Sequence, residues 1–285
     1  MVDDCKGWHS QSRFVDVNGW PAHYVDMGGF GFTVILLHGI LVSSWAWRFN
    51  IDALSQHFRV IALCQKGFGW SGKGADKYTI WSLSRFVTDF MDVMGIEKAD
   101  LVGNSLGGAV AMAVAVQRPE RVRSLVLVDA AGVPIRHGSG LLKLQAPRLT
   151  MLYRAAFRPW LLRFILRTLV YEKLPIDSNY MDGFLTPLRR DGSIKSGVSV
   201  AKNLGVGFRE LFARVSSIQQ PVQLIWGRHD RLVPVRVAEV LNSSIPQAQL
   251  MIFDDCSHCP HEEDPVRFNR AVIEFLNRTN LEMAA

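Results

Sequence analysis

The sequence lacks the features that mark small secreted domains and membrane-spanning proteins. It has 4 cysteines in 285 residues, which is no disulfide framework for a chain of this size, so a reduced, cytoplasmic protein is expected. It has no run of ~18 uncharged apolar residues, the minimum for a membrane-spanning helix. The first residues, Met1 to Lys6, are acidic and carry no apolar segment, so no secretory signal is expected.

Acidic residues are missing from one long stretch of the chain. The stretch from Pro134 to Tyr171 carries no Asp or Glu, and its basic residues are Arg136, Lys143, Arg148, Arg154, Arg158, Arg163 and Arg167. The chain has a net charge of +6, but no nucleic-acid-binding motif accompanies it, and no nucleic acid partner is expected. We interpret the stretch as a solvated polar face. Contact with an anionic membrane surface, contact with an acidic partner, or an arginine that binds a substrate carboxylate are the alternatives.

Short apolar runs alternate with helical patterns through most of the chain. The expected strands are a hairpin of 13–17 and 20–26 around Asn18-Gly19, followed by 33–37, 58–63, 99–102, 122–128, 222–226 and 249–253. The expected helices are 43–54, 82–94, 109–116, 234–241 and 265–276. Continuous apolar strands are typical of a sheet that is covered on both sides. The pattern therefore predicts an α/β fold with a mostly parallel central sheet and helices on both faces.

The alternation stops between residues 134 and 217, which are irregular or helical in pattern. Ligands of such sheets bind at the carboxyl ends of the strands, where this insertion begins. We therefore predict a core of residues 13–133 and 218–285 and a helical cap of residues 134–217 over the site.

A strand, a tight turn and a helix meet at Gly103-Asn104-Ser105-Leu106-Gly107, a G-x-S-x-G motif. A serine at the apex of such a turn is held in a strained backbone, and the glycines on either side remove Cβ atoms that would clash. The motif is common by chance, but the strand before it and the helix after it favour Ser105 as a nucleophile.

A serine nucleophile needs a base that is oriented by an acid. His258 follows the strand 249–253 and is the predicted base, and the order Ser, acid, His is typical of this turn. The predicted acid is Asp230, which follows the preceding strand. Asp129, after the strand 122–128, is the alternative acid.

The chemistry also needs donors for a developing oxyanion. The backbone N–H of Leu106 begins a helix, and the N–H of Ile40 lies in the loop after the strand 33–37, so these two are predicted. The residues Trp45, Phe68, Phe157 and Trp160 are candidates for an apolar substrate pocket. The dense cluster of Cys256, His258, Cys259 and His261 lacks a second, distant ligand pair, so no metal and no cofactor are expected.

The sequence resembles the α/β-hydrolase family from about Arg13 onward. The resemblance is carried by residues 37–39 (LHG), 67–71 (GFGWS), 103–108 (GNSLGG), 226–230 (WGRHD) and 257–265 (SHCPHEEDP). It implies Ser105 as nucleophile, Asp230 as acid, His258 as base, and the amides of Ile40 and Leu106 as oxyanion donors. Two positions depart from the family pattern: Cys64 stands where Asp is usual, and Ser257 stands where Gly is usual.

The resemblance implies a serine hydrolase that cleaves a mainly apolar ester through an acyl-enzyme. The alternatives are a carbon–carbon bond hydrolase of a vinylogous diketone and a non-hydrolytic biosynthetic or binding member of the fold. Dehalogenases and epoxide hydrolases of this fold place Asp where Ser105 stands, which argues against both. Many carbon–carbon bond hydrolases have Trp where Cys259 stands. The sequence leaves the oligomeric state open.

Overall fold

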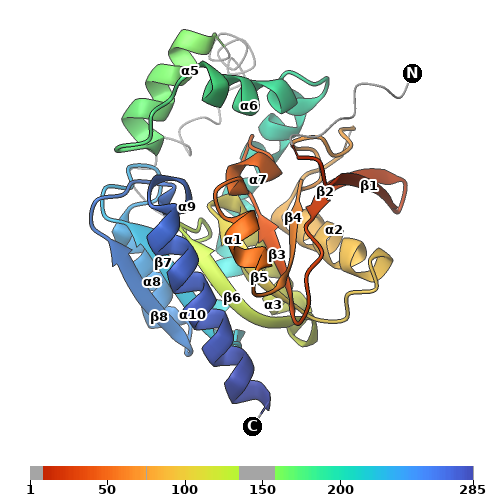
Figure 1. Ribbon diagram of the computed structural model, residues 1–285, viewed down its shortest axis with the longest axis vertical. Helices are drawn as coiled ribbons and strands as arrows, with labels where there is room; N and C mark the ends of the chain where they lie inside the picture. The colour runs from red at the N-terminus through yellow and green to blue at the C-terminus, as the bar shows by residue number, and fades with distance from the viewer. Residues whose placement is uncertain (1–8, 75, 135–157, 285) are drawn as a thin grey trace.

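A computed structural model describes residues 9–74, 76–134 and 158–284. Eight strands form one sheet in the order β1-β2-β4-β3-β5-β6-β7-β8 (Figure 1). The strands are β1 (Ser12–Val17), β2 (Trp20–Asp26), β3 (Thr33–Leu37), β4 (Arg59–Leu63), β5 (Ala99–Asn104), β6 (Val122–Val128), β7 (Val222–Gly227) and β8 (Ala248–Phe253). The pairs β1–β2 and β2–β4 are antiparallel, and the other pairs are parallel. The predicted α/β class and mostly parallel sheet are confirmed.

Helices cover both faces of the sheet. Alternate residues of each strand point to opposite faces, so each face contributes side chains to its own apolar cluster. In β3, Ile35 and Leu37 belong to one apolar cluster, together with α2 (Ile80–Val93), α3 (Leu106–Gln117) and α8 (Val235–Ser244). Val34 and Leu36 belong to the other cluster, with α1 (Ile51–Ser55) and α10 (Pro265–Ala284). Because the strands β3 to β8 are parallel, the loops at their carboxyl ends lie at the same edge of the sheet.

The expected helix over residues 43–54 is wrong, because the structure divides it into two short pieces. A 3-10 helix η1 (Ser44–Trp47) is followed by a break and then by α1. The side chain of Asn50 lies in the break and donates its Nδ2 to the carbonyl of His261 and to Oδ1 of Asn269. These bonds to the carboxyl-terminal part of the chain hold the turn at a point where local periodicity alone predicts a continuous helix.

The described part of the inserted segment is helical. It contains α5 (Pro159–Ile165), η4 (Leu166–Val170), α6 (Ser178–Leu188), α7 (Ser193–Phe212) and η5 (Val215–Ser217). The helices α5 and α6 lie at the end of the molecule opposite the C-terminus (Figure 1), and they form a small apolar cluster of their own with Cys259. The apolar side of α7 joins the core cluster that contains α2 and α3.

The basic stretch is only partly described, since Arg136, Lys143, Arg148 and Arg154 lie outside the described residues. Arg163 donates to the carbonyl of Ile176. The outer side of α5 exposes Trp160 and Phe164. Within the described part of the chain, no helix is both long enough and apolar enough to cross a membrane.

Candidate active site

The predicted nucleophile Ser105 sits between β5 and α3 in a conformation that L-residues rarely adopt. Its φ is 54° and its ψ is −115°, close to the first central position of a type II′ turn, which glycine usually occupies. Four hydrogen bonds hold it there. Its N–H donates to the Val128 carbonyl at 2.9 Å, and its carbonyl accepts from the amides of Gly108, Ala109 and Ala131. The neighbouring elements therefore impose the strained backbone.

Gly103 and Gly107 are required by close backbone approach. A Cβ at Gly103 would lie 2.4 Å from the carbonyl oxygen of Gly107, and a Cβ at Gly107 would lie 2.1 Å from that of Leu37. No side chain fits at these distances, so the G-x-S-x-G spacing reflects the packing of β5 and α3 against β3.

The predicted base and acid are in direct contact. Nδ1 of His258 lies 2.7 Å from Oδ2 of Asp230, and both residues are buried. The other oxygen of Asp230, Oδ1, accepts the amides of Leu232 at 2.7 Å and Val233 at 2.9 Å. The carboxylate therefore has three donors in a site closed to solvent, and it fixes the orientation of the imidazole ring.

The alternative acid, Asp129, is not hydrogen-bonded to His258. Its Oδ1 instead accepts the amide of Gly227 at 3.0 Å, and the residue is fully buried with φ at 44°. Burial first, and then the negative charge of Asp230, raise the pKa of Asp129 well above its usual value. The geometry therefore favours Asp230 over Asp129 as the partner of the histidine.

The loop that carries His258 is fixed from several sides. The backbone N–H of His258 donates to the carbonyl of Val170 at 3.0 Å, and Nδ2 of Asn104 donates to the carbonyl of His258 at 3.1 Å. Ser257, one of the two departures from the family pattern, donates its N–H to Glu263 and its hydroxyl to the carbonyl of His229. Ser257 is not among the described residues with positive φ, so its Cβ is tolerated without strain.

The other departure, Cys64, occupies a buried site that suits an anion. Its sulfur lies 3.2 Å from Nδ1 of His23 and accepts the backbone N–H of Ser44 at 3.3 Å. Burial alone raises the pKa of the Cys64 thiol, but the interactions with His23 and His38 outweigh it and lower this pKa well below its usual value. The two histidines and the Ser44 amide therefore favour negative charge at this position, where the family pattern has a carboxylate.

The two residues predicted as oxyanion donors line the same cavity as Ser105. Ile40 and Leu106 both line a cavity that also reaches Ser105 and His258. The N–H of Leu106 begins α3, and first-turn amides of a helix have no carbonyl partner within it. In the described part of the chain, no hydrogen bond joins Oγ of Ser105 to His258. Hydrogen bonds between a nucleophile and its base are often long in the absence of substrate and shorten when it binds.

The cavity is mainly apolar. Many of its apolar side chains come from the inserted segment (Leu166, Val170, Phe184, Leu204 and Phe208) and from the β7–α8 region (Leu232, Val233 and Val237). Sequence reasoning missed these residues, because the helices of the inserted segment and the β7–α8 region come together at the site only through tertiary packing.

Three of the predicted pocket residues do not line this cavity. Trp45 packs its ring on Tyr180, with centroids 5.0 Å apart, and beneath the guanidinium of Arg48. Phe68 is buried in the core against His38, and Trp160 is 66% exposed on the outside of α5. These three predictions are corrected, because an aromatic side chain can pack elsewhere in the protein, as Trp45 and Phe68 do, or lie on the surface, as Trp160 does, and residue type alone does not distinguish these outcomes. Phe157 lies outside the described residues.

A polar group on the cavity wall was also missed. Glu262 in α9 (Pro260–Glu263) and Tyr171 both line the cavity. Oε1 of Glu262 accepts the hydroxyl of Tyr171 at 2.8 Å, and Oε2 accepts Nη1 of Arg48 at 2.6 Å. The position of Glu262 four residues after His258 could have drawn attention to it.

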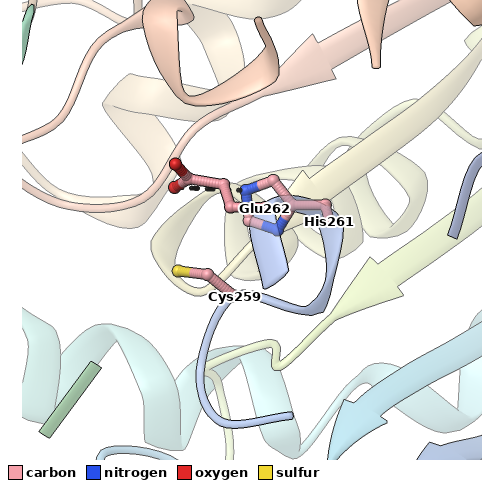
Figure 2. Close-up of side chains that lie close together, drawn as sticks. All are labelled: Cys259, His261 and Glu262. Atoms are coloured by element: carbon pink, nitrogen blue, oxygen red, sulfur yellow. Dashed lines mark ion pairs between the residues drawn. The ribbon is translucent and has the colours of Figure 1, made fainter. Parts of the chain in front are cut away.

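Glu262 also belongs to a buried cluster with Cys259 and His261 whose side chains lie close together (Figure 2). One potential ligand atom from each residue lies within 4.8 Å of the others. The cluster is poorly suited to a cation, because both carboxylate oxygens are engaged and Arg48 supplies a positive charge. Burial first, and then the charge of Glu262, raise the pKa of the Cys259 thiol well above its usual value, so the thiol stays neutral.

Known proteins resemble this chain in sequence and in architecture. The chain is 33% identical over 263 residues to 2-hydroxymuconate semialdehyde hydrolase of Pseudomonas sp. (strain CF600), covering 87% of this chain and 88% of the relative. It is 35% identical over 273 residues to 2-hydroxy-6-oxononadienedioate/2-hydroxy-6-oxononatrienedioate hydrolase of Burkholderia vietnamiensis (strain G4 / LMG 22486), covering 90% and 91%.

Among solved structures, a serine hydrolase involved in carbazole degradation aligns with a TM-score of 0.79 and 28% identity, over 93% of this chain and 98% of that one. A sequence model of the alpha/beta hydrolase fold matches residues 33–265. The strained serine turn, the mostly parallel sheet and this match agree: the chain belongs to the α/β-hydrolase family and is an enzyme of the hydrolase class.

Proposed function

We propose that the chain is a serine hydrolase that cleaves a bond next to an acyl carbonyl through an acyl-enzyme on Ser105. The observation that carries the proposal is the placement of Ser105 and His258 on one cavity, with His258 held by Asp230 at 2.7 Å. A hydroxyl becomes an effective nucleophile only beside such an oriented base.

Each residue then has a defined role. His258 takes the proton of Ser105 as the hydroxyl oxygen attacks the carbonyl carbon, and Asp230 stabilises the imidazolium that forms. The amides of Ile40 and Leu106 donate to the oxyanion. His258 returns the proton to the leaving group, and water activated by the same imidazole then hydrolyses the acyl-enzyme. We also propose that residues 134–217 act as the cap, since Val170, Phe184 and Phe208 of this segment line the cavity.

Two kinds of bond fit this mechanism. The first candidate is the carbon–carbon bond beside a ketone, the alternative of the sequence analysis, because two of the relatives bear the names of hydrolases for a muconate semialdehyde and for oxononadienedioates. The comparisons support this alternative better than the ester.

The second candidate, a mainly apolar ester, is favoured by the cavity of this chain. The cavity is mainly apolar, the one carboxylate among the described residues that line it, Glu262, is already paired with Arg48, and Cys259 stands where many carbon–carbon bond hydrolases have Trp.

The test compares wild type, Ser105→Ala, His258→Ala and the control His229→Ala on two substrate sets. The sets are p-nitrophenyl esters of increasing chain length and vinylogous diketones, with and without a carboxylate. His229 is exposed and contacts the site loop through its backbone, so its variant should stay active. Loss of Ser105 or His258 should lower kcat by about 10⁴-fold or more. Undiminished turnover in Ser105→Ala would refute the proposal.

Labelling with a fluorophosphonate reagent distinguishes a working serine hydrolase from the remaining alternative, a non-hydrolytic member of the fold. Labelling of Ser105 without turnover of either set indicates a working nucleophile with a narrow substrate range. Absence of labelling in the folded wild type supports a non-hydrolytic member of the fold.

A further inference from the structure

The proposed mechanism leaves one buried carboxyl group beside its centre without a role. Asp129 follows β6 and is fully buried. One oxygen of Asp129, one of Asp230 and one ring nitrogen of His258 all lie within 4.8 Å of one another. Oδ1 of Asp129 accepts the amide of Gly227 at 3.0 Å. Within the described part of the chain, Oδ2 of Asp129 has no hydrogen-bond donor.

Two carboxyl groups this close and this buried cannot both carry a charge at low energetic cost. The numbers of hydrogen-bond donors decide where the charge resides. Asp230 has three donors, namely the amides of Leu232 and Val233 and Nδ1 of His258. Asp129 has one donor, the amide of Gly227. The charge therefore resides on Asp230, and the proton resides on Asp129.

We infer that Asp129 is held as a neutral carboxylic acid whose Oδ2–H donates a hydrogen bond to the carboxylate of Asp230. This inference rests on the proposed function, because Asp129 would affect catalysis only through the Asp230–His258 pair. Asp129 is then a positioning residue that does not touch the substrate. Its proton gives the lone oxygen Oδ2 a partner, and it spreads part of the negative charge of Asp230 away from the imidazole.

The surroundings of Asp129 agree with a neutral group. Asp230 comes from the loop after β7, Glu263 from α9, and His258 and Cys259 from the loop before α9. The charges of Asp230 and Glu263 add to burial in raising the pKa of Asp129 well above its usual value. The N–H of Asp129 donates to the carbonyl of Ile225 at 3.0 Å, which fixes the residue between β6 and β7.

The backbone of Asp129 supplies a matched pair of variants. Its φ of 44° is unfavourable for most residues, but Asn and Gly both tolerate it. In Asp129→Asn the amide oxygen accepts from Gly227 and the NH₂ group donates to Asp230, as the neutral acid does. Asp129→Gly keeps the backbone conformation and removes the donor. The two variants therefore separate the hydrogen bond from backbone strain.

The experiment measures kcat/KM against pH for wild type, Asp129→Asn, Asp129→Gly and Asp230→Asn. We expect Asp129→Asn to keep the rate and the pH profile. Asp129→Gly should lose roughly 10- to 100-fold in kcat/KM, the range for a hydrogen bond to a charged group, because the carboxylate of Asp230 loses a donor that keeps it oriented toward His258. The acidic side of this variant's pH–rate profile, the acid limb, should move to higher pH. Without the hydrogen bond from Asp129, the negative charge of Asp230 stabilises protonated His258 more strongly. A merely structural role would not move this limb.

Two results would overturn the inference. If Asp129→Asn loses as much activity as Asp230→Asn, Asp129 works as an ionised acid. If Asp129→Gly matches wild type in rate and in acid limb, Asp129 positions nothing. A difference infrared spectrum of wild type minus Asp129→Asn at neutral pH detects the neutral carboxyl directly and needs no turnover. Failure of the proposed function, seen as full activity of Ser105→Ala, is therefore distinguishable from absence of this proton.

Discussion

Replacing Ser105 by glycine should stabilise the protein while it abolishes activity. The φ of 54° and ψ of −115° at Ser105 place an L-residue in a conformation that glycine adopts freely. Strain of this kind amounts to about 1–3 kcal/mol at a single residue. The tight packing around the turn, rather than the side chain of Ser105, imposes the conformation.

The matched control is Ser105→Ala, which also removes the hydroxyl but keeps a Cβ and therefore the strain. Glycine gives the unfolded chain more freedom, which lowers stability by about 0.4–1 kcal/mol. Ser105 is only partly buried and lines the cavity, so loss of its Cβ leaves no closed void. Subtracting the two terms leaves Ser105→Gly more stable than Ser105→Ala by about 1.3 kcal/mol at the midpoints of the two ranges, with limits of roughly 0 and 2.6 kcal/mol.

Urea unfolding followed by tryptophan fluorescence measures this difference, provided that refolding is reversible and the slopes agree. Both variants should be inactive and unlabelled by a fluorophosphonate. A midpoint for Ser105→Gly at or below that of Ser105→Ala would show that the turn stores no strain, and the structural reason for G-x-S-x-G given above would fail.

Three further predictions follow from the structure. Cys64→Asp should be more stable than Cys64→Val by about 1–3 kcal/mol in urea unfolding, because valine leaves the buried His23 without its partner; equal stabilities would contradict an anion site. The pKa of Asp129 is raised in the folded protein, so the folded protein keeps this group protonated at pH values where the unfolded chain, with an ordinary pKa of ~3.9, has it ionised. The contribution of Asp129 to the free energy of unfolding is therefore lost as the pH rises above about 4. The stability advantage of Asp129→Asn over wild type should therefore grow from about pH 4 towards pH 8, and an advantage that shrinks over this range would refute the protonated state. If the basic segment contacts membranes, a Trp160→Ala/Phe164→Ala double variant should sediment less with phosphatidylserine vesicles than wild type does. The control Phe30→Ala, which changes an exposed aromatic remote in sequence, should sediment as wild type does. A wild type that does not bind the vesicles would contradict the contact.

The local sequence around each strand was enough to predict the architecture. The runs TVILL and VRSLVLV occupy β3 (Thr33–Leu37) and β6 (Val122–Val128), as predicted from their continuous apolar character. Burial on both faces leaves no room for polar alternation, so these strands are recognisable without knowledge of their neighbours. The break between η1 and α1 was not predictable in this way, because it depends on bonds from Asn50 to residues more than 200 positions away.

The sequence by itself determined which residues of the candidate site come together at the ends of the strands. Ser105, Asp230 and His258 follow β5, β7 and β8, and parallel strands bring their ends to one edge, so order along the chain was sufficient. Only the tertiary structure shows which of Asp230 and Asp129 contacts His258, because both follow strands and it is the carboxylate of Asp230 that reaches Nδ1. It also decided the cavity wall, where Tyr171 and Glu262 meet from distant segments, while Trp45 and Phe68 pack elsewhere. Side-chain type and spacing carry information about the near neighbours in a strand or helix, whereas the partners across a packed interface depend on how the whole chain folds.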